Sequence, residues 1–213
     1  MNLLPALRII SCLLFVYAGL ASYIALYAPP EIAEYLYSET GPYEVFSVGL
    51  WFVLTPVAWL NSSLSTRTRI ITGIAAVLLG ARELDLHKSL FSMSFIKTSF
   101  YKSTTIPFQD KVLGALLLIA IIALIVQLGM SFFRHLRQRG VNDLPTLLLV
   151  IGLVLGVLCK FLDRFASQMR ELFAIQIDPA TRQFVGALEE SFEMVVPLFI
   201  ILALLMHTRK SRH

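Results

Sequence analysis

The sequence predicts an all-α polytopic membrane protein with six transmembrane helices, both termini in the cytoplasm and short interfacial helices in the outer loops. Three observations predict this class: 57% of the 213 residues are hydrophobic, only 15% are charged, and the apolar residues form long uncharged runs. A soluble domain has roughly 45–50% apolar and about 25% charged residues. Six spans of about 20 residues would use most of the chain, so we expect a single integral membrane domain over residues 1–213.

Six uncharged runs mark the expected spans, of which three are full length and three are short. They are Ile9–Ala28, Val45–Thr66, Ile70–Ala81, Val112–Phe133, Leu144–Cys159 and Met194–Met206. No small-residue cleavage site precedes Pro29, so we expect the first run to be a retained anchor and not a signal peptide. Gly152 and Gly156 form a GxxxG pattern in the fifth run, which permits close approach of a neighbouring helix.

Basic residues predict the orientation through the positive-inside rule. The inner segments, 30 residues in all, hold nine Lys or Arg and a single acid, Asp143; the outer segments hold nine Lys or Arg in 80 residues, with thirteen acids. The inner segments are 1–8, 65–69, 134–143 and 207–213, and the outer ones are 29–44, 82–111 and 160–193. We therefore expect both termini in the cytoplasm. The location that we expect separately, a bacterial inner (cytoplasmic) membrane, would put the long connections in the periplasm. The basic residues form short clusters and no stripe or tail, which argues against a nucleic-acid partner and makes the lipid bilayer the expected one.

Two outer segments are predicted to form interfacial helices. Segment 88–108 is rich in aromatic residues, and segment 165–176 places apolar residues at helical spacing beside Arg170 and Glu171. Such amphipathic segments lie in the plane of the membrane interface. The turn at Asp178-Pro179 then precedes the last helix.

The short runs place ionisable residues at membrane depth. The twelve residues of Ile70–Ala81 rise only about 18 Å, whereas the hydrocarbon core is about 30 Å thick. The helix must therefore continue through residues 82–87, and the sixth run is likewise preceded by residues 188–193. The fifth run leads into Lys160 and residues 163–164. Three helices thus bring carboxylates to one depth on the outer side.

Residues four apart share a helix face, which pairs Glu83 with His87 and Glu189 with Glu193. These pairs, with Asp163 nearby, would suit a divalent metal ion that activates a water molecule. The predicted metal ligands are Glu83, His87, Asp163, Glu189 and Glu193. The predicted catalytic residues are Glu83, His87, Asp163 and Glu193.

A structural interpretation of the same charges stays open. Membrane-depth charges usually pair with one another, and four bases (Arg82, Lys88, Lys160 and Arg164) stand among six acids (Glu83, Asp85, Asp163, Glu189, Glu190 and Glu193). A salt-bridge belt would then join three helix ends without any chemistry. The excess of acids over bases favours a bound cation or a protonated carboxyl group.

Outside this cluster, a few polar residues have simpler predicted roles. Gln127 lies deep in the fourth run, where an interhelical hydrogen bond is expected. Three histidines, His135, His207 and His213, lie among inner arginines and are expected to contact lipid headgroups.

Two motifs carry a resemblance. The sequence R-E-x-D at residues 82–85 and L-E-E-x-x-E at residues 188–193 resemble a loose group of uncharacterised bacterial polytopic inner-membrane proteins. This resemblance covers most of the chain and implies the helical membrane fold, but it implies no activity. Alkaline-ceramidase-like hydrolases also gather acids and histidines around a metal at one membrane face. This chain has only His87 at that face and no seventh span, so no catalytic roles are transferred from them.

Three functions follow from these observations. The first is a metal-dependent membrane hydrolase acting on a lipid or lipid-linked substrate, with the outer interfacial segments guiding the substrate. The second is a non-catalytic membrane subunit or scaffold whose outer charges form a structural belt. A transporter is disfavoured, because the inner halves of the six runs lack the ionisable groups that an ion path requires. The sequence leaves the oligomeric state open.

Overall fold

The computed structural model describes residues 3–38, 40–84, 86, 91 and 93–210. All regular secondary structure in these residues is helical, as the sequence predicts. The helices are α1 (Leu4–Tyr27), α2 (Pro30–Leu36), α3 (Pro42–Leu60), α4 (Thr66–Glu83), α6 (Thr98–Lys102), α7 (Phe108–Arg139), α8 (Leu144–Phe173) and α9 (Pro179–Lys210). Five of them, α1, α3, α7, α8 and α9, are long and apolar enough to cross a membrane. The chain therefore has the architecture of an integral membrane protein.

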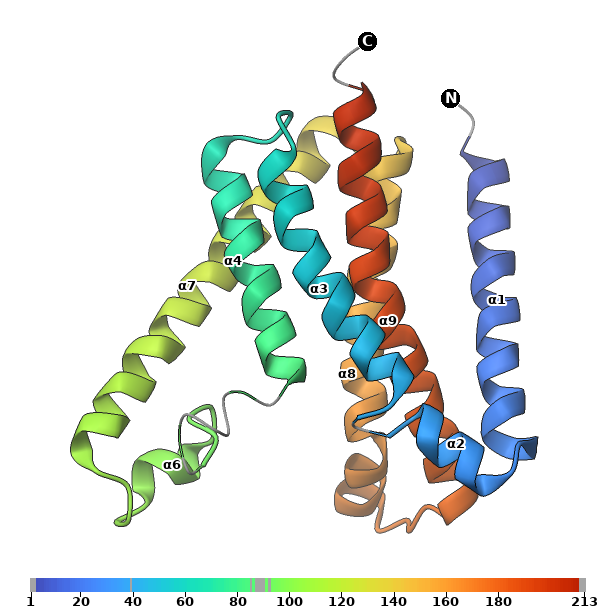
Figure 1. The fold of residues 1–213 in the computed structure, drawn as a ribbon, viewed down its shortest axis with the longest axis vertical. Helices are drawn as coiled ribbons and strands as arrows, with labels where there is room; N and C mark the ends of the chain where they lie inside the picture. The colour runs from blue at the N-terminus through green and yellow to red at the C-terminus, as the bar shows by residue number, and fades with distance from the viewer. Residues whose placement is uncertain (1–2, 39, 85, 87–90, 92, 211–213) are drawn as a thin grey trace.

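Helix α4 differs from the other five predicted spans in its charge. Its uncharged middle, residues 70–81, is preceded by two arginines and followed by Arg82 and Glu83. Because of these charges, α4 is not among the five apolar candidate spans. It nevertheless packs along α3 inside the bundle (Figure 1). A Cβ atom on Gly80 would lie 3.3 Å from the Cβ atom of Trp51, so this glycine permits the close approach.

Helix α9 lies at the centre of the bundle and packs against α8, α3 and α1 (Figure 1). A Cβ atom on Gly152 of α8 would lie 3.4 Å from the Cβ atom of Phe199 and 3.5 Å from the carbonyl oxygen of Val196, which confirms the close approach predicted from the GxxxG pattern. The main core contains Trp51, Leu54, Ala58, Ala76, Leu155, Cys159, Phe192, Val195, Val196, Ile201 and Leu204.

Helix α7 stands apart from this bundle. It slants away from α8 and α9 in Figure 1, and only 6% of its most apolar window is buried, against 50% for α9. Its first half is covered by a second core that consists of Phe91, Phe95, Phe100 and Ile106. A Cβ atom on Gly114 of α7 would lie 2.9 Å from the Phe100 ring, so this glycine admits the aromatic cluster.

The outer connections differ in part from the predicted interfacial helices. Two short helices, α2 and α6, lie at the end of the bundle opposite the two termini (Figure 1). The described part of segment 88–108 buries Phe91, Phe95 and Phe100 against α7 and does not lay them along the interface. The separate helix predicted at 165–176 is wrong, because α8 continues without a break to Phe173. Its 30 residues rise about 45 Å, so the last turns can extend beyond the hydrocarbon core.

The turn before α9 confirms the prediction at Asp178-Pro179. The Asp178 carboxylate accepts a hydrogen bond from the Thr181 backbone N–H at 3.0 Å and another from the Thr181 hydroxyl at 2.6 Å. These hydrogen bonds hold the pKa of Asp178 below its ordinary value. A negative charge here also complements the dipole at the start of α9.

Polar residues at the other end of the bundle form a buried chain. The His135 Nε2 atom lies 2.9 Å from the Thr146 hydroxyl, which donates to Asp143 at 2.7 Å. The rings of His135 and His207 lie edge to face with centroids 5.5 Å apart. His207 is 8% exposed, so its predicted contact with lipid headgroups is wrong: helix packing covers it. His213 lies outside the described residues.

Candidate functional site

Carboxylates gather at the end of the bundle that lies opposite the termini. Four helices supply them: α3 at its first turn, α4 at its last residue, α8 after its apolar half and α9 before its apolar half. The described members are Glu44, Glu83, Asp163, Glu189, Glu190 and Glu193, which we call the acid cluster. All except the half-exposed Asp163 are partly buried. The convergence of helix ends predicted from run lengths is therefore present.

Lys160 joins α8 to α9 within the acid cluster. Its Nζ atom lies 2.8 Å from Glu193 Oε1, whereas its distance to Asp163 Oδ2 is 3.9 Å. The Glu193 side chain is only 15% exposed, against 50% for Asp163. Glu193 is therefore the main partner of this ammonium group, and Asp163 lies at the edge of the site.

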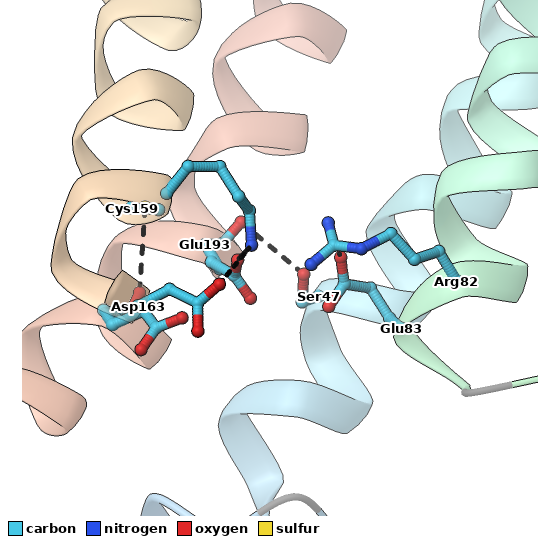
Figure 2. Close-up of polar contacts among 8 residues, drawn as sticks. Ser47, Arg82, Glu83, Cys159, Asp163 and Glu193 are labelled. Atoms are coloured by element: carbon cyan, nitrogen blue, oxygen red, sulfur yellow. Dashed lines mark hydrogen bonds and ion pairs between the residues drawn. The ribbon is translucent and has the colours of Figure 1, made fainter. Parts of the chain in front are cut away.

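Backbone contacts fix this part of α9 against its neighbours. The Cys159 thiol of α8 donates to the Glu189 carbonyl oxygen at 3.8 Å, and the Ser47 hydroxyl of α3 donates to the Glu193 carbonyl oxygen at 3.5 Å. Figure 2 shows Cys159, Asp163 and Glu193 on one side of the site, with Ser47 between them and the end of α4. These two hydrogen bonds hold the helical turn from Glu189 to Glu193 against α8 and α3.

Glu83 enters the site from α4. Its side chain is 12% exposed, and its Oε1 atom lies 3.4 Å from Arg82 Nη1. Figure 2 shows this pair facing the Glu193 side of the site. The Glu83 carboxylate interacts electrostatically with two cations, Arg82 and Lys160, and with the carboxylates of Glu193 and Glu44. The two predicted site residues Glu83 and Glu193 thus interact electrostatically with each other, and both interact with Lys160.

The described members of the acid cluster outnumber the bases around them. Glu190 interacts with four other carboxylates, those of Glu193, Glu189, Glu44 and Glu83. The described bases in this layer are Arg82, Lys160 and Arg164, and Arg164 makes no ion pair with a described residue. Like charges in a partly desolvated site favour retention of a proton by one of the carboxyl groups. Such a group can donate a proton during a reaction.

Neighbouring tyrosines were missed by the sequence reasoning. The Tyr17 hydroxyl donates to the carbonyl oxygen of the fully buried Ser191 at 3.0 Å. Tyr37 stacks on Tyr43 with ring centroids 5.0 Å apart. Burial and the nearby Tyr43 raise the pKa of Tyr37 to about 12, so it stays a neutral hydroxyl donor. The only signal in the sequence is the position of two of these tyrosines around the Gly41-Pro42 turn.

The predicted metal site is only partly described. His87 lies outside the described residues, as does Asp85, so the Glu83–His87 pair is not observed. Among the residues that the structure describes, no group of three or more His, Cys, Asp or Glu side chains is arranged to hold a metal ion. Glu189 and Glu193 do lie together, and Glu193 interacts with Lys160. The described geometry is that of a carboxylate and ammonium site.

Comparison with known proteins gives no relative: no family model, curated protein or solved structure matches this chain. The function is therefore argued from the site itself.

Proposed function

We propose a six-span topology in which α4 provides the sixth crossing and both termini lie in the cytoplasm of a bacterium. Both termini lie at the same end of the bundle (Figure 1), and an even number of crossings is required for that arrangement. Five apolar helices and α4 together supply six. Nine Lys or Arg residues in the inner segments support this orientation. The acid cluster then faces the outer side of the inner membrane.

We propose that the acid cluster is the reaction site of a membrane hydrolase that acts on a lipid or lipid-linked substrate at the outer leaflet. One observation carries this proposal: among the residues that the structure describes, partly buried carboxylates from four helices outnumber the cations around them. Ionisable groups at membrane depth are costly, and they usually serve a function.

The proposed chemistry needs one carboxylate and one protonated carboxyl group. Glu193, 2.8 Å from the Lys160 ammonium, is assigned as the base. Glu83, whose side chain is 12% exposed and interacts with the carboxylates of Glu193 and Glu44 as well as with Arg82, is assigned as the acid. The base takes a proton from a water molecule, whose oxygen forms a bond to the carbonyl carbon or phosphorus atom of the substrate. The bond to the leaving-group oxygen breaks, and Glu83 gives that oxygen its proton. Lys160 stabilises the negative charge on the reacting group.

An open groove supports access from the outer leaflet. It has a volume of about 530 Å³ and lies between α2 and the first turns of α9. Glu34, Tyr37 and Gln183 provide polar groups in its lining, and Ala187 is three residues from Glu190. A lipid headgroup in this groove would lie about one helical turn from the acid cluster.

A structural belt is the second candidate, favoured by the 2.8 Å ion pair between Lys160 and Glu193. This pair joins α8 to α9, the two helices with the most extensive contact in the described part of the bundle. In a non-catalytic subunit the charges would serve only to hold these helices together.

The test measures activity and stability on the same samples. Purified protein in phospholipid nanodiscs is incubated with lipids that carry ester or phosphate bonds, and the products are measured by mass spectrometry. Glu83→Gln and Glu193→Gln are each expected to lower product formation about 100-fold or more. The matched control is Glu171→Gln, an exposed acid of α8, which should keep full activity. His87→Gln tests a predicted site residue that lies outside the described residues.

The same samples distinguish the hydrolase from the belt. In the hydrolase, Glu83→Gln keeps its thermal midpoint while activity is lost. Absence of product with every lipid, or activity that falls only as far as the amount of folded protein, would support the structural belt.

A further inference from the structure

A second polar site lies at the opposite end of the bundle, between the start of α4 and the second half of α7. It is an open groove of about 480 Å³ lined by Arg67, Gly129, Met130, Phe133 and Arg134. Two guanidinium groups thus share one groove with apolar walls. None of these residues belongs to the acid cluster.

Arg67 is held in place without being neutralised. Its Nη2 and Nε atoms donate to Gln127 Oε1 at 2.9 and 3.3 Å, which also confirms the interhelical hydrogen bond predicted for Gln127. The acceptor is a neutral amide, so the positive charge remains available. Arg134 donates from Nε to the Met130 carbonyl oxygen of its own helix at 3.3 Å. Neither arginine makes an ion pair with a described residue.

Acidic groups are scarce around this groove. Its lining contains none, and the inner segments contain only Asp143. Asp143 is 8% exposed and accepts a hydrogen bond from Thr146, so it belongs to the buried chain between α7 and α8. The two arginines therefore present a net positive charge to any ligand in the groove.

Apolar stripes extend from each arginine toward the middle of the membrane. On α7 the stripe consists of exposed side chains at spacings of three or four residues: Ile119, Ile122, Val126, Met130 and Phe133. On α4 the corresponding exposed side chains are Ile70, Ile74 and Val77. Such spacing places each set on one helix face. Gly129 adds open space, since nothing lies within 4 Å of a Cβ atom placed there.

We propose that this groove binds an anionic phospholipid, with the phosphate between Arg67 and Arg134 and the acyl chains along the stripes on α4 and α7. Guanidinium groups bind phosphate oxygens through two parallel hydrogen bonds, which suits two arginines facing one phosphate. Basic grooves between membrane helices are known to take anionic headgroups. A zwitterionic lipid would add a cation, for which the lining offers no acid.

The experiment measures lipid-dependent thermal stability and bound lipid. Full-length protein in a neutral detergent is titrated with phosphatidylglycerol, with phosphatidylcholine, or with inorganic phosphate, and native mass spectrometry counts the lipids that stay bound. Phosphatidylglycerol is expected to raise the thermal midpoint and to remain bound. Phosphatidylcholine and inorganic phosphate are expected to do neither.

Two variants and one control assign the effect to this groove. Arg134→Gln should weaken phosphatidylglycerol binding about fivefold, and Arg67→Gln with Arg134→Gln about 25-fold, given the contribution of each arginine near an anionic lipid. Arg137→Gln removes an exposed arginine three residues further along α7 and should leave the affinity unchanged.

Arg134→Gln keeps the test valid if the double variant fails to fold, because Arg134 bonds only to its own helix among the described residues. Equal binding of phosphatidylcholine, an equal effect of inorganic phosphate, or unchanged binding by Arg134→Gln would each overturn the proposal.

Discussion

Helices α7 and α9 have the same length, 32 residues, and both contain a long apolar stretch. Half of the apolar window of α9 is buried, however, whereas only 6% of that of α7 is buried. The polar residues of the acid cluster explain part of the difference. Glu193 forms an ion pair with Lys160 of α8. The backbone carbonyl groups of Glu189 and Glu193 accept hydrogen bonds from Cys159 of α8 and Ser47 of α3. On α7 the deep polar group is Gln127, which a single arginine satisfies. The pairing of polar groups thus contributes to the central position of α9.

The largest difference in stability is expected between two glycine variants, one at the contact of α8 with α9 and one on α7. Gly152→Leu inserts a side chain where a Cβ atom already lies 3.4 Å from Phe199 of α9, and we expect overpacking to cost about 1–3 kcal/mol. Gly129→Leu on α7 inserts the same side chain into open space and should change stability by less than about 0.5 kcal/mol. Thermal unfolding in detergent without anionic lipid measures both. Equal destabilisation would mean that α7 packs as closely as α9.

The next largest effect on stability is expected from the hydrogen bonds that join α7 to α8. Thr146→Val keeps the shape of a fully buried side chain but removes its hydrogen bonds to Asp143 and His135. Leaving these groups without that partner should cost about 1–2 kcal/mol. Thr72→Val on α4 is the control, since its hydroxyl makes no hydrogen bond with a described residue. An unchanged midpoint for Thr146→Val would show that α7 is held by other contacts.

The ion pair on α9 gives a smaller effect on stability. Lys160→Met removes the partner of Glu193, and because Lys160 is 45% exposed we expect a cost of about 1 kcal/mol. Adding Glu193→Gln removes the uncompensated carboxylate and should recover part of that loss in a double-mutant cycle. Lys102→Met, on an exposed residue of α6, controls for loss of charge alone. A coupling energy of zero would show that this ion pair does not contribute to the central position of α9.

Metal removal is expected to have the smallest effect. The proposed chemistry uses only protein side chains, those of Glu83, Glu193 and Lys160. Dialysis against a chelator should therefore leave both the thermal midpoint and the product formation unchanged. Loss of activity that returns with a divalent cation would instead support the metal site predicted with His87.

Helix positions were largely predictable from the sequence, and so was the layer of carboxylates. An uncharged run too short for the hydrocarbon core must continue into charged residues, and this argument predicted that Glu83, Lys160 and Glu193 lie at the same end of the bundle. The helix that it predicted through residues 82–87 ends at Glu83, however. The same argument could not place Tyr17 beside Ser191, because a tyrosine inside an apolar run is common in membrane helices. Nor could it show that His207 is covered by helix packing. Basic neighbours in the sequence are found beside buried histidines and beside histidines that contact lipid headgroups alike.

The sequence by itself determined that the chain is a helical membrane protein, where its long apolar segments lie and that its carboxylates gather at one end. Only the tertiary structure decided which helices pack together: that α9 is central, that α7 stands apart, and that the Phe91, Phe95 and Phe100 side chains cover α7. The physical reason is that lipid is as apolar as a leucine side chain, so hydropathy places a helix in the membrane without choosing its neighbours. Close packing at residues such as Gly152 and the pairing of buried charges make that choice.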